Sequence, residues 1–75
     1  MPRFYELSCR FDSRKSFYGK AMVETLDNGD QVLYSYNTEV ASIRGGKFET
    51  TYAATYSQTT RRHVREFARQ NGFDW

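Results

Sequence analysis

The sequence is poor in the residues that crosslink chains, bind metals or cross membranes. Its single cysteine, Cys9, excludes an internal disulfide and a cysteine-based metal cluster, and a reduced, intracellular protein is the simplest inference. No uninterrupted apolar run exceeds three residues, so we expect no membrane-spanning helix. The N-terminus also lacks the apolar region of a signal peptide, which argues against secretion by that route. With 75 residues, the chain is expected to form one domain, residues 1–75.

Groups typical of catalysis are equally scarce. His63 is the only histidine, and its helical neighbours supply no second metal ligand, so we predict a hydrogen-bonded side chain at the boundary of the core. The carboxylates lie singly in predicted turns or on outward strand positions. The Gly45-Gly46 pair is followed by neither the lysine-serine/threonine pair nor the helix of a phosphate loop. We therefore predict a protein with no catalytic residues, no metal and no cofactor, and hence not an enzyme.

Aromatic residues, in contrast, are frequent. Six Phe, six Tyr and one Trp make up 17% of the chain, and rings of this size allow few residues to build a small core. Alternating apolar positions and turn residues predict strands at residues 5–11, 17–25, 31–36, 39–44 and 47–52. No helix separates these strands, so they are expected to pair antiparallel as a meander. The predicted fold class is α+β, with about four to five short strands and one C-terminal amphipathic helix packed on a face of the sheet.

Individual positions in the strands support finer predictions. The Asn-Gly pair at residues 28–29 predicts a tight hairpin, since both residue types tolerate positive φ angles. Cys9 lies on the inward parity of the first strand and is predicted to be a small buried apolar residue rather than a nucleophile. The small residues Gly19 and Ala21 indicate a close approach by another element, for which Phe67 of the helix is the candidate.

The C-terminal stretch, residues 56–75, is the segment with a clear helical period. At about 100° per residue, its apolar side chains gather on one side of the helical wheel. This predicted stripe consists of Thr60, Val64, Phe67, Ala68 and Asn71. A helix with one such stripe is expected to lay it on the sheet formed by the preceding residues.

Residues near the two ends of this stretch predict where the helix starts and stops. Ser57 is the favoured N-cap, with Tyr56 packing against the entry. Residues 71–72, Asn-Gly, predict the stop because they tolerate the left-handed conformation, and Phe73 then folds back onto the last turn. Trp75 either frays with the end of the chain or joins the core.

The other side of the helix carries the charge excess of the chain. The formal net charge is +2, and residues 1–56 hold equal numbers of basic and acidic side chains. The clustered cations, which are the predicted partner-binding residues, are Arg61, Arg62, Arg65 and Arg69. Like charges one turn apart cost about 0.2–0.5 kcal/mol per pair, and only Glu66 offers relief within the helix. Two interpretations stay open: a functional surface, or a solvated face that Glu39 or Glu49 of the sheet helps to neutralise.

Three segments resemble a small domain of unknown function that is common in bacteriophages and prophages of gut and lactic bacteria. They are SFYGKA (16–21), LYSYNTEVA (33–41) and YSQTTRRHVREFARQNGF (56–73), which match SFYGKA-, SYNTxVA- and YSxTTxRHxxEF-type segments in order and spacing. The resemblance covers nearly the whole chain. It implies a viral or mobile-element origin and action in the cytoplasm of a bacterial host, and it supplies no reaction.

An arginine surface implies an anionic target, of which two classes are considered. The first is a host protein or nucleoprotein, because interfaces favour Arg and Tyr, and here the phage resemblance implies an inhibitor of host defence such as an anti-CRISPR protein. The alternative is a small nucleic-acid-binding protein, with phosphates on the arginines and bases stacked on Tyr34 and Tyr36. Both tyrosines share the parity of Val32, which favours core packing for them. A homodimer through a sheet edge or an aromatic patch is a further interaction that so small a core favours.

Overall fold

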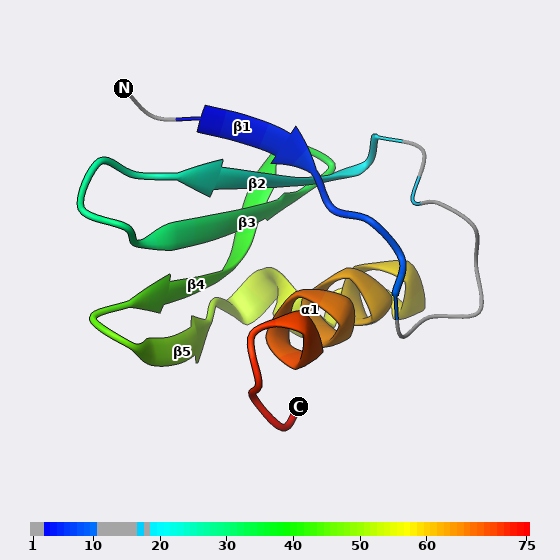
Figure 1. Cartoon of the computed structure of the whole chain (residues 1–75). Coiled ribbons are helices and arrows are strands. Elements are labelled where there is room, and N and C mark those ends of the chain that lie inside the picture. The colour runs from blue at the N-terminus through cyan, green and yellow to red at the C-terminus, as the bar shows by residue number, and fades with distance from the viewer. Residues whose placement is uncertain (1–2, 11–16, 18) are drawn as a thin grey trace.

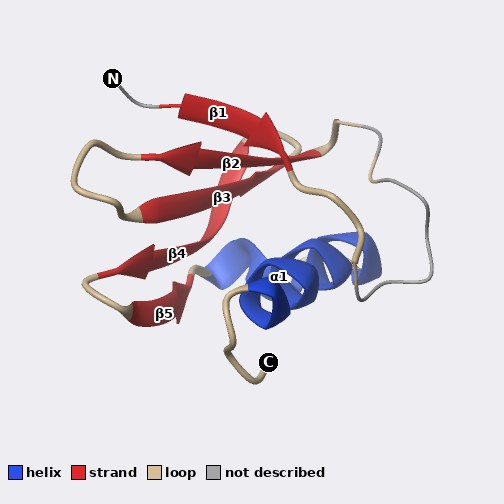
Figure 2. Ribbon diagram, viewed as in Figure 1, coloured by secondary structure: helices blue, strands red, loops and turns tan. Residues whose placement is uncertain are grey.

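The protein has two layers, an antiparallel sheet and a helix that lies across one of its faces (Figures 1 and 2). The computed structural model describes residues 3–10, 17 and 19–75. Its elements are β1 (Arg3–Glu6), β2 (Ala21–Thr25), β3 (Gln31–Ser35), β4 (Thr38–Arg44), β5 (Lys47–Thr50), the 3₁₀ helix η1 (Tyr52–Thr55) and α1 (Gln58–Gln70). Each strand pairs antiparallel with the next, in the order β1-β2-β3-β4-β5. The predicted α+β meander with a C-terminal helix is therefore confirmed.

Several strands are shorter than predicted, and local conformation explains two of the differences. β2 begins at Ala21 because Gly19 turns the chain with a φ of 75°. Apart from the neighbours of Gly19 in the chain, no atom of the described residues lies within 4 Å of the place where its Cβ would be, so the predicted close approach is wrong there. β5 ends at Thr50 because the Thr51 hydroxyl accepts a hydrogen bond from the Ala53 N–H and caps η1, a helix that was not predicted. Phe11, predicted on the first strand, lies outside the described residues.

The predicted hairpin between β2 and β3 is confirmed, with a slightly different geometry. Leu26 N–H donates to Asp30 O at 2.8 Å, and Gly29 N–H donates to Leu26 O at 3.0 Å. Within this turn only Gly29 has a positive φ, at 92°. Asn28 contributes through its side chain instead, since its Oδ1 accepts a hydrogen bond from Asp30 N–H. The loop is a three-residue turn that ends in a left-handed glycine.

The core-facing side of β3 differs from the prediction. Leu33 lies opposite Val23 and Ala41, and all three are fully buried in the core under the helix. Tyr34, the next residue, therefore faces the other way, and Tyr36 has already left the strand. Because side chains alternate along a strand, shifting the inward parity by one residue reverses every position. The prediction of core packing is wrong for Tyr34 for this reason, and it is wrong for Tyr36 because this residue lies in the turn after β3 and is 50% exposed.

A bulge in the β3–β4 pairing adds a second irregularity. The register passes from Leu33 opposite Ala41 to Tyr34 opposite Glu39, which leaves Val40 as the extra residue on β4. Val40 and Ala41 are consecutive and are both buried in the core. A strict alternation cannot place two neighbours on one face, so a bulge is what brings both into the interior.

Both ends of α1 are stabilised by caps. Ser57 is the N-cap, as predicted, and its Oγ accepts a hydrogen bond from the Thr60 N–H at 3.1 Å. At the other end Phe73 N–H donates to Ala68 O and Gly72 N–H to Arg69 O, with Gly72 at a φ of 81°. This paired pattern is the Schellman motif. Tyr56 is 84% exposed, so the predicted packing at the helix entry is wrong.

The buried side of α1 is wider than the predicted stripe. Its buried residues are Thr60, His63, Val64, Glu66, Phe67 and Ala68. Asn71 is exposed instead, with its Nδ2 donating to Phe67 O. Phe67 lies at the centre, with its ring centroid 6.3 Å from that of Phe48 on β5. Phe73 stacks on the same Phe48 ring, while Trp75 and the half-buried Cys9 pack against the edge of the core.

The packing predicts a clear contrast between two Phe→Ala substitutions. Phe67→Ala opens a cavity in the core and should lower the free energy of unfolding by about 3–5 kcal/mol, or leave the chain unfolded. Phe4→Ala, on an exposed ring of β1 that touches Tyr34, should cost about 1 kcal/mol or less. Urea unfolding followed by circular dichroism measures both. Equal losses would contradict the placement of the core.

Candidate functional site

Three of the four predicted arginines form an exposed row along α1. Arg61, Arg65 and Arg69 are exposed and lie one helical turn apart, on the side away from the sheet. Within the part of the chain that the structure describes, their side chains make no ion pair or hydrogen bond. Arg62 lies beside this row, is half-buried and interacts with other groups of the protein. We call Arg61, Arg65 and Arg69 the arginine row.

The carboxylate of α1 does not neutralise this row. Glu66 is only 1% exposed, and its Oε2 accepts hydrogen bonds from Arg10 N–H at 3.0 Å and from Gln70 Nε2 at 2.6 Å. Gln70 Nε2 also donates to Ser8 O at 2.6 Å. Through these hydrogen bonds, Glu66 and Gln70 connect the helix to the segment that follows β1. Sequence reasoning missed this contact, although the one-turn spacing of Glu66 and Gln70 was a signal for it.

The sheet carboxylates considered as neutralising groups point elsewhere. Glu39 lies opposite Tyr34 and Glu49 lies opposite Ser42 in the strand register. Tyr34 follows Leu33 in the chain and Ser42 follows Ala41, and both Leu33 and Ala41 face the helix. Glu39 and Glu49 therefore belong to the sheet face turned away from α1. The row keeps its positive charge on the surface.

A shallow hollow of about 290 Å³ adjoins the N-terminal end of the row. It is lined by Thr55, Arg61, Arg65 and Trp75. The tail after α1 brings Trp75 back along the helix, so that the indole packs on the edge of the core and also lines this hollow. Of the two fates considered for Trp75, joining the core is the one observed. No sequence signal indicated its place beside the arginines.

The two tyrosines proposed as stacking surfaces lie apart from the row. Tyr34 is on the sheet face opposite α1, with its hydroxyl donating to Glu24 Oε1 at 3.0 Å and its ring 6.2 Å from Phe4. Tyr36 lies at the turn after β3. Its ring is 5.9 Å from the ring of His63, which belongs to the buried side of the helix. Lys20 Nζ lies 5.6 Å from the centre of the Tyr36 ring. The structure does not bring either tyrosine together with the arginines.

His63 is hydrogen-bonded, as predicted, but it lies in the core rather than at its boundary. Its Nδ1 is 2.8 Å from Ser35 Oγ, and both residues are buried. The Phe17 ring packs edge-on against the imidazole at 4.5 Å. Enclosed in this way, the imidazole joins β3 to α1. Among the described residues, no three His, Cys, Asp or Glu side chains gather as metal ligands would, and no helix is long and apolar enough to span a bilayer.

The surroundings of Tyr34 predict a loss of stability at high pH. Burial first, then the hydrogen bond to Glu24 and the charges of Glu24 and Glu39, raise the pKa of this phenol above its ordinary value of 10.0, with Arg44 acting in the opposite direction. The folded state thus holds the proton to higher pH than the unfolded chain does. The stabilisation is full below pH 10 and is lost as the pH rises through the raised pKa.

Unfolding in urea at about pH 9 and about pH 11 measures this effect. The free energy of unfolding should fall between the two, and the fall should be smaller in Tyr34→Phe, which has no phenol to titrate at this position. A remaining fall is expected from Tyr5, since burial also raises the pKa of that phenol. An identical fall in both proteins would contradict the assigned environment of Tyr34.

Comparison with known proteins identifies the family but not an activity. Neither the curated proteins nor the solved structures gave a match. A family model described as a family of unknown function, DUF8033, matches residues 5–74. That description states no source, so the phage or prophage origin inferred from the sequence stays a prediction. Because the match spans almost the entire chain, the protein belongs to the DUF8033 family of unknown function.

Proposed function

We propose that the protein is a non-enzymatic binding module that places its arginine row on an acidic surface of a partner protein. The observation that carries this proposal is the row itself. Arg61, Arg65 and Arg69 are exposed and unpaired in the described structure, while the carboxylate nearest to them in sequence, Glu66, is buried and bonded elsewhere. A partner with carboxylates at matching positions would supply the missing counter-charges.

The energetic argument is local. Arg61/Arg65 and Arg65/Arg69 are like-charged neighbours, each pair unfavourable by about 0.2–0.5 kcal/mol in an isolated helix. In the described structure no carboxylate pairs with the row to offset this repulsion, and only Arg69, in the last turn, lies where the helix macrodipole favours a cation. A carboxylate bound between two arginines replaces this repulsion by a net attraction, because guanidinium groups form paired, charge-assisted hydrogen bonds with carboxylates. Local costs of this kind commonly accompany functional surfaces.

A protein partner fits this surface better than a nucleic acid. The hollow at the end of the row joins two arginines to Trp75, and these are the residue types that dominate the centres of protein interfaces. Stacking of bases on Tyr34 and Tyr36 would need these rings beside the row, and both lie elsewhere. The nucleic-acid alternative therefore keeps its phosphate contacts but loses the aromatic contacts first considered for it.

The setting of the interaction rests on the sequence resemblance alone. The resemblance to phage and prophage domains points to a bacterial host cell, and it is the support for a host-defence target such as a CRISPR effector. No residue of the arginine row distinguishes that target from another acidic host protein. The proposal is accordingly an acidic host protein, with inhibition of host defence as its specific form.

A capture experiment with charge-matched variants tests the proposal. The immobilised protein should retain an acidic protein from a bacterial lysate, and the triple variant Arg61/Arg65/Arg69→Ala should lose it. The control Arg3/Arg44/Lys47→Ala removes three exposed cations of the sheet and should retain the partner. Raising the salt concentration should release it, since exposed charge pairs are screened. Equal retention by both variants would contradict a role for the row.

A second measurement separates the nucleic-acid alternative. Labelled DNA and RNA are titrated with the protein at several salt concentrations, and weak binding without dependence on the row is expected. Tight binding at low salt that weakens steeply with added salt, and whose slope is flattened by the triple variant, would instead identify a phosphate-binding surface. That result would replace the protein-partner proposal.

A further inference from the structure

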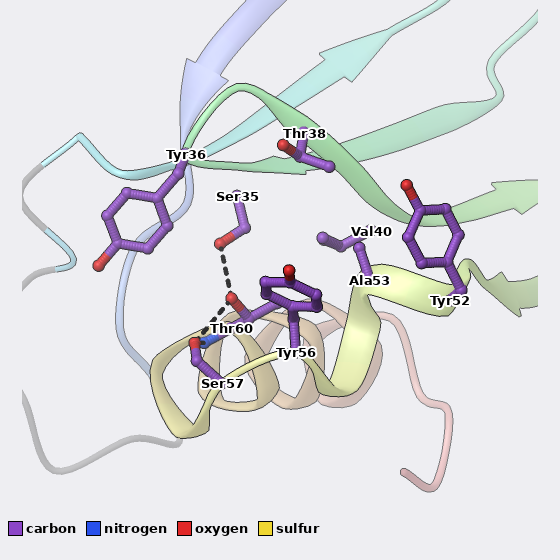
Figure 3. A pocket seen from close by; sticks show the side chains of 9 residues that line it. All are labelled: Ser35, Tyr36, Thr38, Val40, Tyr52, Ala53, Tyr56, Ser57 and Thr60. Atoms are coloured by element: carbon purple, nitrogen blue, oxygen red, sulfur yellow. Dashed lines mark hydrogen bonds between the residues drawn. The ribbon is translucent and has the colours of Figure 1, made fainter.

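A second depression, of about 430 Å³, lies away from the arginine row, between the β3–β4 turn and the segment that runs from η1 into α1 (Figure 3). Three tyrosines line it: Tyr36 from the turn, Tyr52 from η1 and Tyr56 just before the helix. In the view of Figure 3, Tyr56 stands between the other two. We call this depression the tyrosine pocket.

The three rings are unusually open to solvent for their size. Tyr52 is 90% exposed, Tyr56 84% and Tyr36 50%, and a ring of this kind buries roughly 150–250 Å² when it is covered. Val40 and Ala53 line the pocket between them and belong to the buried core. The pocket therefore has an apolar base with aromatic walls that the protein itself leaves uncovered.

The backbone at Tyr36 is held in a conformation that its side chain does not favour. Tyr36 has a φ of 51° and Asn37 a φ of 67°, the left-handed pair of a two-residue hairpin turn. Asn and Gly are the usual residues in such turns, and a bulky side chain at positive φ is uncommon. Lys20 Nζ, 5.6 Å from the ring centre, and the His63 ring hold the Tyr36 ring in place. A tyrosine is thus kept at a turn where a smaller residue would fold more easily.

Among the residues that the structure describes, the polar side chains of the pocket are hydroxyls, and none of its lining side chains is charged. Among these, Ser57 Oγ donates to Thr60 Oγ1 at 3.0 Å, and Ser35 Oγ lies 3.4 Å from Thr60 Oγ1, so these hydroxyls bond one another. In the described part of the chain, the hydroxyls of the three tyrosines and of Thr38 make no hydrogen bond. The polar groups of the site without an internal partner are therefore neutral hydroxyls, which can donate or accept, placed around aromatic rings.

We propose that the tyrosine pocket binds a proline-containing segment of another protein in the polyproline II conformation. Such a segment presents flat apolar rings and outward carbonyl oxygens, and its prolines have no N–H that requires an acceptor. Aromatic-lined grooves with hydrogen-bond donors are the general means of recognising it. A charged ligand would lack counter-charges here, and an amphipathic helix would lack the continuous apolar wall that it needs. The pocket is separate from the arginine row, and the proposal stands without it.

The test uses fluorescein-labelled decaproline as the probe, with fluorescence polarisation for affinity and two-dimensional ¹⁵N–¹H NMR for location. Decaproline should bind and should shift the amide signals of residues 36–38 and 52–57. A Gly-Ser peptide of the same length should not bind. Tyr52→Ala and Tyr56→Ala each should weaken decaproline binding roughly tenfold, as expected for an aromatic residue at the centre of an interface.

Two controls keep the test independent of folding and of the arginine row. Tyr52→Phe and Tyr56→Phe retain the rings and should lose only part of the affinity, about twofold to fivefold, because a neutral hydrogen bond contributes about 0.5–1 kcal/mol. Arg61/Arg65/Arg69→Ala should bind decaproline as the natural protein does, so failure of the row and failure of the pocket are distinguishable. Circular dichroism confirms folding of each variant.

Three outcomes would overturn the proposal. The first is no binding of decaproline at millimolar concentration. The second is binding that Tyr52→Ala and Tyr56→Ala leave unchanged. The third is a shift of the same amide signals by a neutral oligosaccharide such as maltotetraose in the absence of any shift by decaproline, which would assign the pocket to a sugar.

Discussion

The structure depends on burying one side of α1 against one face of a five-stranded sheet. Phe67, Val64 and Ala68 meet a sheet face centred on Leu33 and Ala41, and no second layer covers the other face in the described structure. This constraint fixes the rotation of the helix about its axis. Once the apolar side is turned in, the residues half a turn away must face water, and the arginine row follows without any contact that specifies it. The surface proposed for binding is thus a geometric consequence of the core.

The period of the helix made its layout predictable from sequence. Four of the five predicted stripe residues are buried, the N-cap and the C-terminal stop are where Ser57 and Gly72 place them, and three of the four arginines are exposed. Helix signals of this kind are local, since they depend on spacing and on single capping residues. The antiparallel order of the strands was predictable for a related reason, because short turns leave no room for any other connection.

The positions that could not be predicted depend on tertiary contacts. Val32 and Leu33 are both apolar, so alternation alone cannot decide which faces the helix, and the bulge at Val40 removes the parity signal on β4 as well. His63 and Glu66 are polar residue types, yet both are buried, because partners distant in sequence hydrogen-bond them. Ser35 is the partner of the imidazole, and the Arg10 N–H is a partner of the carboxylate. The tyrosine pocket could not be predicted because its three rings come from separate segments, one of which is the unpredicted helix η1.

The bonds that Glu66 and Gln70 make to Arg10 and Ser8 have an implication for how the molecule opens. They join the chain just beyond the edge strand β1 to the closing turns of α1, across a separation of 56 and 62 residues. An edge strand normally detaches first, because it is held on one side only. Here detachment of β1 also removes the hydrogen bonds that α1 makes with Arg10 N–H and Ser8 O, and so loosens the helix. Detachment of β1 from the edge of the sheet and release of α1 are therefore coupled in a single cooperative event.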